Sequence, residues 1–149
     1  MRSRPSALPA LAAMPASMSY DVGAALPVAA VTALQGLRDH GGVTAGSSVL
    51  INGAAGSLGT AAVQLAKGFG AEVTGVCSTR NVAFVKSLGA DHVIDYNRAD
   101  FTANRGTYDV IYDTVGKSSF KAARRALKSD GLYISPVLSL GLLGQMLFG

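Results

Sequence analysis

The feature that most constrains the fold is a set of three evenly spaced glycines between two apolar segments: Gly53, Gly56 and Gly59. The segment before them, residues 47–53, is short and rich in β-branched residues, which predicts a buried strand. The segment after them, residues 57–70, repeats apolar residues at helical spacing and ends in glycine, which predicts a helix. Glycine allows a sharp turn and lets a phosphate group approach the backbone without a Cβ in the way. Strand, glycine turn and helix together predict a dinucleotide-binding unit.

The start of the predicted helix supplies the chemistry for holding an anion. Backbone amides around Ser57 and Leu58 would face a pyrophosphate at the positive end of the helix dipole. A nucleotide-binding P-loop would need a lysine after the third glycine, whereas Gly59 is followed by Thr60 and Ala61. A short-chain dehydrogenase is excluded because none of the five tyrosines stands four residues before a lysine. A purely structural turn with no ligand stays open as the alternative.

The rest of the chain alternates between strand-like and helix-like segments. Strands are predicted at residues 47–53, 72–77, 92–96, 108–116 and 131–137. Helices are predicted at residues 17–39, 57–70, 81–89 and 119–128, with a poorly patterned helix or loop at 97–106. This alternation implies parallel strands joined by right-handed crossovers. We therefore expect an α/β Rossmann fold, a doubly wound parallel sheet of about five strands ordered 3-2-1-4-5 within three αβα layers.

The length of 149 residues corresponds to one domain. Residues 1–16 are expected to be an N-terminal extension, and residues 17–149 to form the NAD(P)-binding domain. The first helix of that domain has Ser17 or Ser19 as its candidate N-cap.

Composition excludes several classes of function. Thirteen Lys and Arg against nine Asp and Glu give a net charge of +4, but no basic stripe interleaved with aromatic residues accompanies it, so no nucleic-acid partner is expected. Cys77 is the single cysteine, which rules out a disulfide within the chain and favours a reducing compartment, so we expect a cytoplasmic protein. His40 and His92 are the two histidines, too few for a zinc cluster of nitrogen and sulfur ligands, and no metal is expected.

Two apolar stretches are candidates for a signal peptide or a membrane span. Residues 1–17 begin like a signal peptide but contain three prolines, which argues against that interpretation. Residues 132–149 carry no charge, yet Pro136, Gly141 and Gly144 interrupt them. We expect a buried strand followed by an apolar connection there, and no membrane span.

The residues after the second predicted strand bear on which dinucleotide would bind. An acidic residue at this position would bind the ribose hydroxyls of NAD and repel a 2′-phosphate. The chain instead has Ser78, Thr79 and Arg80, whose hydroxyl and guanidinium groups suit a phosphate dianion. These residues predict NADP(H), with a merely solvated Arg80 as the alternative. Asp95, after the third strand, is the nearest acid in a comparable place, and Tyr96 beside it could lie against an adenine.

Four stretches identify a family resemblance: "AALPVAAVTALQGL", "VLINGAAGSLGTAAVQLAKGFGAEVTGVCSTRN", "SLGADHVIDY" and "YDVIYDTVG". In this order they resemble the medium-chain dehydrogenase/reductase superfamily, in its zinc-independent quinone oxidoreductase (zeta-crystallin-like) branch. The resemblance covers residues 14–137. It implies a domain that binds NADPH, which reduces quinones or activated enones by hydride transfer.

The resemblance implies cofactor contacts along much of the chain. At the nicotinamide end, it implies that Thr32 lies beside the nicotinamide or its ribose and that Val137 lies near the nicotinamide. At the pyrophosphate, it implies contacts from Gly56, Ser57 and Leu58, within the turn that also contains Gly53 and Gly59. Thr114 would lie between the ribose and the pyrophosphate.

Towards the adenosine, the resemblance implies that Tyr96 contacts that end of the cofactor. It also implies that Ser78, Thr79, Arg80 and Asn81 surround the 2′-phosphate. The family sometimes has a lysine at the position of Asn81.

In this family a separate GroES-like domain supplies the substrate pocket and most catalytic side chains. We expect that domain and a sixth strand to be absent from these residues, so no catalytic residue is assigned. The expected function is the NADPH-binding domain of a zinc-independent quinone or enone oxidoreductase. The alternatives are a catalytically inactive truncated remnant or a dinucleotide-binding interaction module. A homodimer stays open.

Overall fold

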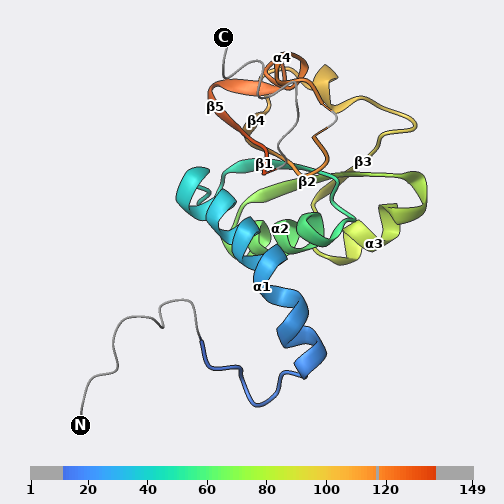
Figure 1. The fold of residues 1–149 in the computed structure, drawn as a ribbon. Coiled ribbons are helices and arrows are strands. Elements are labelled where there is room, and N and C mark those ends of the chain that lie inside the picture. Colours follow the sequence, from blue (N-terminus) through green and yellow to red (C-terminus); the bar gives the residue numbers. More distant parts are fainter. Residues whose placement is uncertain (1–11, 117, 137–149) are drawn as a thin grey trace.

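A computed structural model describes residues 12–116 and 118–136, which form a parallel sheet with helices on both faces (Figure 1). The five strands are β1 (Ser48–Asn52), β2 (Glu72–Cys77), β3 (His92–Asp95), β4 (Tyr108–Asp113) and β5 (Leu127–Ile134). Their order in the sheet is β3-β2-β1-β4-β5, and every neighbouring pair is parallel. The predicted strand order is thus confirmed.

The central strand β1 shows why these sequences form a buried parallel sheet. Val49 pairs in register with Val73 of β2 on one side and with Val110 of β4 on the other. Val49 and Ile51 point into one hydrophobic core, while Leu50 between them points into a second core on the opposite face. Because both faces are covered, the strand is apolar at consecutive positions rather than at alternate ones.

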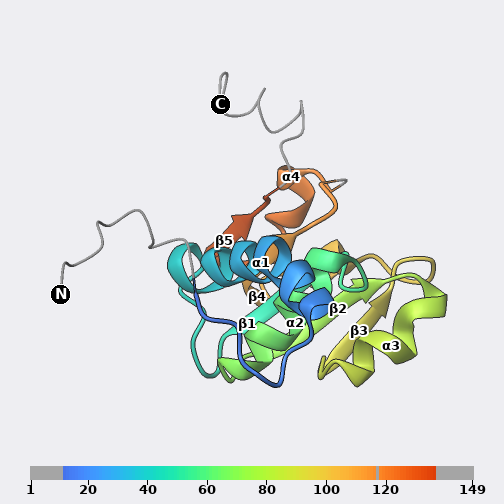
Figure 2. The same ribbon diagram turned by 60° about the horizontal axis from the view of Figure 1, so that its bottom comes forward.

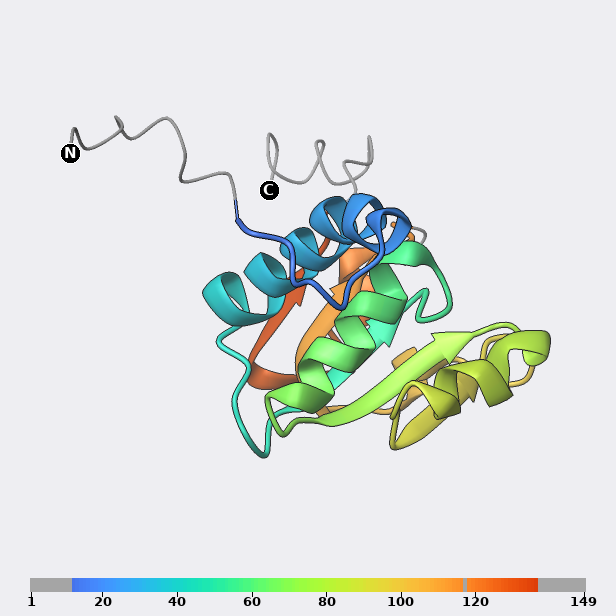
Figure 3. The same ribbon diagram turned by 90° about the horizontal axis from the view of Figure 1, so that it is seen from below.

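Helices cover the two faces unequally. The helical segments are α1 (Tyr20–Leu34), which continues as the π-helical turn η1 (Gln35–His40), α2 (Ser57–Gly68), the short turn η2 (Thr79–Asn81), α3 (Val82–Ser87), the short turn η3 (Phe101–Ala103) and α4 (Phe120–Ala123). Figure 2 and Figure 3 show α1, α2 and α3 together on one face. The other face is packed by η3 and α4, through Phe101 and Ala123.

Of the two N-cap candidates for the first helix, Ser17 and Ser19, the structure selects Ser19, so α1 begins at Tyr20. Ser19 is its N-cap, with extended backbone angles, and its hydroxyl accepts a 3.3 Å hydrogen bond from the backbone N–H of Val22. Pro27 lies inside this helix. Among residues 12–116 and 118–136, one continuous helical segment, Tyr20–His40, has the length and the apolar composition that a membrane span requires. A core helix of a soluble protein meets the same criterion, so the absence of a membrane span stays a prediction.

The helix predicted over residues 119–128 is wrong beyond its first turn. Helix α4 is Phe120–Ala123, and the chain then joins the sheet as β5 from Leu127. The carbonyl of Ala126 accepts hydrogen bonds of 2.8 Å from the N–H of Thr107 and 3.0 Å from that of Tyr108. The Ala126 carbonyl, which a longer helix would use within itself, therefore bonds to the start of β4 instead. The strand predicted at residues 131–137 accordingly starts earlier, at Leu127.

Candidate functional site

The carboxyl ends of β1 and β4 form the edge of the sheet where the chain departs in two directions. After β1 the chain turns to α2 on one face, and after β4 it turns to α4 on the other (Figure 1). Adjacent parallel strands whose connections leave on opposite faces open a crevice between them, which is where ligands bind in doubly wound sheets.

The turn from β1 to α2 is fixed by two of the three glycines. Gly53 has a φ of +78°, and a Cβ there would approach Thr114 Oγ1 and Val115 Cγ2 to 2.5 Å. A Cβ at Gly59 would overlap the carbonyl oxygen of Gly53, so the first turn of α2 lies directly against the strand end. Both glycines are therefore required by the fold itself.

Gly56 differs from the other two glycines because nothing crowds it. It is exposed, and the nearest heavy atom to a Cβ there would be the Gly53 carbonyl oxygen at 3.4 Å. Gly56 is also the N-cap of α2, and no side chain caps this helix. The first amides of α2, around Ser57 and Leu58, thus meet open space at the positive end of the helix, which fits an anionic group.

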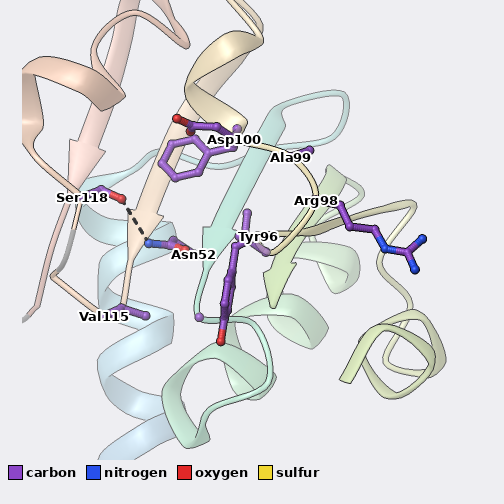
Figure 4. Close-up of a pocket in the computed structure, with 10 residues that line it drawn as sticks. Asn52, Tyr96, Arg98, Ala99, Asp100, Val115 and Ser118 are labelled. Atoms are coloured by element: carbon purple, nitrogen blue, oxygen red, sulfur yellow. Dashed lines mark hydrogen bonds between the residues drawn. The ribbon is translucent and has the colours of Figure 1, made fainter. Parts of the chain in front are cut away.

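A cavity of about 720 Å³ lies on one side of this turn (Figure 4). Its lining comes from the ends of β1 and β2, the loop after β3 and the loop after β4: Asn52, Gly53, Val76, Tyr96, Arg98, Ala99, Asp100, Phe101, Val115 and Ser118. Asn52 Nδ2 donates a 3.4 Å hydrogen bond to Ser118 Oγ, which joins two residues on one side of the cavity. Tyr96 is 61% exposed, and Arg98 extends away from the cavity (Figure 4). An aromatic ring beside a mostly apolar lining suits a planar heterocycle such as adenine.

A second hollow, of about 280 Å³, lies on the α1 side of the same helix start. Thr32 of α1 lines it together with Ser57 and Leu58, and Pro136 follows from the end of β5. The two hollows therefore lie on either side of the uncapped end of α2.

The loop after β4 is held by a buried carboxylate. Asp113 Oδ1 accepts 3.0 Å hydrogen bonds from Asn52 Nδ2 and from the N–H groups of Val115 and Gly116, while Oδ2 accepts a 2.7 Å hydrogen bond from the Tyr133 hydroxyl. Asp113 is fully buried, and burial followed by the contact with this carboxylate raises the pKa of the Tyr133 phenol. Four donors thus satisfy an acid that faces no solvent.

Thr114 occupies the position next to the glycine turn. Its hydroxyl donates a 2.7 Å hydrogen bond to the carbonyl of Asn52, and its N–H donates a 3.2 Å hydrogen bond to the same oxygen. The residue therefore joins the loop after β4 to the end of β1.

The segment after β2 forms a compact polar corner. Ser78 Oγ accepts a 3.1 Å hydrogen bond from Asn81 Nδ2. Thr79 Oγ1 donates a 2.5 Å hydrogen bond to Asp95 Oδ2, at the end of the neighbouring strand β3. Arg80 is exposed and makes no ion pair or side-chain hydrogen bond with the described part of the chain.

The structure brings most of the predicted cofactor residues to one edge of the sheet, in three groups. Gly53 and Tyr96 line the larger cavity, Thr32, Ser57 and Leu58 line the smaller hollow, and Ser78 to Asn81 follow β2 without lining either. Val137 lies outside the described residues. Their role in binding stays a prediction.

Other residues at this edge were not singled out from the sequence. Asn52, Val115 and Ser118 line the cavity, and Asp113 holds its loop. The available signal was a polar residue at the carboxyl end of a strand, directly after buried apolar residues, as Asn52 ends β1 and Asp113 ends β4.

A metal site would need several ligating side chains close together. No cluster of three or more His, Cys, Asp or Glu side chains that could hold a metal ion occurs among residues 12–116 and 118–136. Cys77 is buried, and burial raises the pKa of its thiol. Zinc independence stays a prediction.

Comparison with known proteins shows which family the chain resembles. Residues 57–136, more than half of the chain, match the family model described as zinc-binding dehydrogenase. The chain is 38% identical over 132 residues to the mitochondrial NAD(P)H oxidoreductase RTN4IP1 of Bos taurus, covering 83% of this chain and 33% of that protein. It spans about a third of the length of the curated relatives that it matches in this way.

Solved structures show the same fold. The quinone oxidoreductase of Coxiella burnetii superposes with a TM-score of 0.78 and 38% sequence identity, covering 86% of this chain and 41% of that one. The quinone oxidoreductase of Thermus thermophilus, also solved as a complex with NADPH, gives a TM-score of 0.74 and 29% identity, covering 87% of this chain and 45% of that one.

Proposed function

This chain belongs to the zinc-binding dehydrogenase family, as an NAD(P)-binding domain of the quinone oxidoreductase type, and we propose that it serves NADP(H)-dependent, zinc-independent reduction of a quinone or an activated enone. The observation that carries this proposal is the pair of hollows on either side of the uncapped start of α2. A dinucleotide has two ring systems joined by a pyrophosphate, and this arrangement offers one place for each part.

Each part of the proposed site has a separate task. The larger cavity, with Tyr96 at its side, would take the adenosine half. The amides at Ser57 and Leu58 would hold the pyrophosphate, and the hollow beside Thr32 would take the nicotinamide half. Thr32, Ser57 and Leu58 would hold and orient the nicotinamide half, which in its reduced form would supply the hydride.

The preference for NADP(H) over NAD(H) is proposed from Arg80. Its guanidinium is exposed and unpaired among the described residues, one residue beyond the Thr79–Asp95 contact. Ser78 Oγ accepts from Asn81, which leaves the Ser78 hydroxyl proton available to a ligand. A guanidinium and a hydroxyl donor suit a phosphate dianion. In the NADPH-complexed relative from Thermus thermophilus, the same fold accompanies that cofactor.

Calorimetric titration of the chain with NADPH and with NADH tests the proposal. NADPH should bind more tightly, and Arg80→Ala should remove most of the difference, because one charge-assisted contact to the phosphate is lost. Arg105→Ala is the matched control, since Arg105 is exposed in the turn before β4, at the opposite edge of the sheet. Equal affinity of the unaltered chain for the two cofactors would remove the NADP(H) assignment, and absence of binding of either would remove the cofactor function.

A further inference from the structure

The carboxylate of Asp95 lies beside the segment that follows β2. Asp95 is the last residue of β3 and pairs in register with Cys77, the last residue of β2. Its Oδ2 accepts the 2.5 Å hydrogen bond from Thr79 Oγ1, and its Oδ1 accepts a 2.9 Å hydrogen bond from the N–H of Asn97. These bonds, led by that of the Thr79 hydroxyl, hold the pKa of Asp95 below its usual range. The acid therefore lies charged beside the segment proposed to select the cofactor.

The Thr79–Asp95 contact reverses what Thr79 can offer a ligand. The Thr79 hydroxyl has one proton, which is used in the hydrogen bond to Asp95. Its oxygen accepts a 3.3 Å hydrogen bond from Asn97 Nδ2. What remains on this oxygen is acceptor capacity, which suits a ribose hydroxyl. A phosphate dianion offers only acceptors of its own, so this side chain gives it no hydrogen bond.

The ion pair that Asp95 makes with Arg98 neutralises the charge of Asp95 incompletely. Arg98 Nε lies 3.7 Å from Asp95 Oδ2, but the Arg98 side chain is 80% exposed whereas that of Asp95 is 11% exposed. The attraction is weak because the Arg98 guanidinium stays in water, which screens its charge. Arg80 makes no ion pair with the described residues and stays available. The corner therefore combines an acceptor pair, Asp95 and Thr79, with a donor pair, Arg80 and Ser78.

We propose that Asp95 is a specificity-determining residue of this site: its carboxylate, acting directly and through Thr79, favours an unphosphorylated ribose and limits the preference for NADP(H) that Arg80 creates. The chain thus accepts both cofactors, with a moderate preference rather than an exclusive one. This inference rests on the proposed cofactor function.

Asp95→Asn tests the inference because it keeps the shape and removes the charge. The ratio of NADPH to NADH affinity, measured by calorimetry at low salt, should rise on the order of threefold to tenfold, as expected for losing one charge near a phosphate in a partly solvated setting. Asp91→Asn is the matched control: Asp91 comes just before the same strand, at its other end, and pairs with Lys67. Its affinity ratio should equal that of the unaltered chain.

A salt series separates a charge effect from a structural one. The difference between Asp95→Asn and the unaltered chain should shrink as ionic strength rises, because salt screens exposed charges. An unchanged affinity ratio in Asp95→Asn overturns the inference. An equal loss of both affinities, independent of salt, also overturns it, since that result marks a structural role. If the unaltered chain binds neither cofactor, the proposed function fails instead.

Discussion

The hydroxyl of Tyr133 donates a 2.7 Å hydrogen bond to the buried carboxylate of Asp113, which joins the edge strand β5 to the end of β4. The other oxygen of this carboxylate accepts from Asn52, at the end of β1. One acid thus links three strands at the edge of the sheet where the cavity opens. The arrangement stabilises the fold and sets the position of Thr114, so its loss should affect both stability and binding.

The first prediction is that Asp113→Ala destabilises the chain by about 3 kcal/mol or more. The substitution removes the acceptor of four hydrogen bonds, and it leaves the side chains of Asn52 and Tyr133 only their longer contacts with Ser118, at 3.4 Å and 3.5 Å. Poorly satisfied donors in a part-buried setting are costly. Urea unfolding followed by circular dichroism measures the change. Asp130→Asn, at an exposed position on β5, is the control and should stay within about 0.5 kcal/mol of the unaltered chain.

Tyr133→Phe keeps this prediction measurable even where Asp113→Ala does not fold. It removes one donor and leaves the other three bonds to Asp113, so a smaller loss of about 1–2 kcal/mol is expected. A loss below the error of the measurement would show that the contact does not stabilise the fold.

The second prediction compares two glycines of the same helix. Gly59→Ala should destabilise the chain by about 1–3 kcal/mol, because the new Cβ overlaps the Gly53 carbonyl oxygen and forces α2 away from β1. Gly68→Ala should instead stabilise it by about 0.5–1 kcal/mol, since no heavy atom lies within 4 Å of a Cβ there and alanine is the better helix former. Thermal unfolding of both variants provides the test. Equal effects would mean that α2 does not depend on close approach to the turn.

The strand order was predictable from the sequence because strand-like segments alternate with helix-like ones, which implies a doubly wound parallel sheet. The observed β2, Glu72–Cys77, has the predicted bounds, and β1 is shorter than predicted by one residue at each end. The error over residues 119–128 has a physical reason. Ala123, Ala126 and Leu127 fit a helical apolar face, but all three are also buried when the chain leaves the helix and joins β4. Periodicity cannot choose between these two ways of burying the same residues.

The candidate site was predictable where one short segment carries it, and not where partners come from distant segments. The glycine turn and its flanking strand and helix lie within residues 47–70, so their association followed directly from the spacing. The sequence predicts that Thr79 donates to a phosphate, whereas in the structure its hydroxyl donates to Asp95 on a separate strand. Which way a hydroxyl points depends on tertiary partners, and no local pattern encodes them.

The third prediction concerns the glycine that the fold does not require. Gly56→Ala should leave the fold intact, at a cost of about 1 kcal/mol or less, because its Cβ meets no heavy atom closer than 3.4 Å. Binding of NADPH should weaken about tenfold or more, since the new methyl group occupies the space through which the pyrophosphate would approach. Calorimetry of this variant beside Gly68→Ala, which lies at the far end of α2, measures the effect. Unchanged affinity would remove the pyrophosphate from this turn.

The fourth prediction is a pH dependence of stability that originates in Asp109. Its carboxylate accepts a 2.7 Å hydrogen bond from the N–H of Ser48, and this bond, with a smaller effect of Lys128, lowers the pKa of Asp109. A carboxyl with a lower pKa in the folded state stabilises the fold above its unfolded pKa of about 3.9 and loses that effect as pH falls through the folded value. The Asp109 side chain is 34% exposed, so the contribution should be about 1 kcal/mol or less. Urea midpoints between about pH 7 and pH 2 should therefore fall more steeply for the unaltered chain than for Asp109→Asn, whose amide oxygen can keep the Ser48 bond without titrating. Parallel curves for the two proteins would assign the acid sensitivity to other carboxylates.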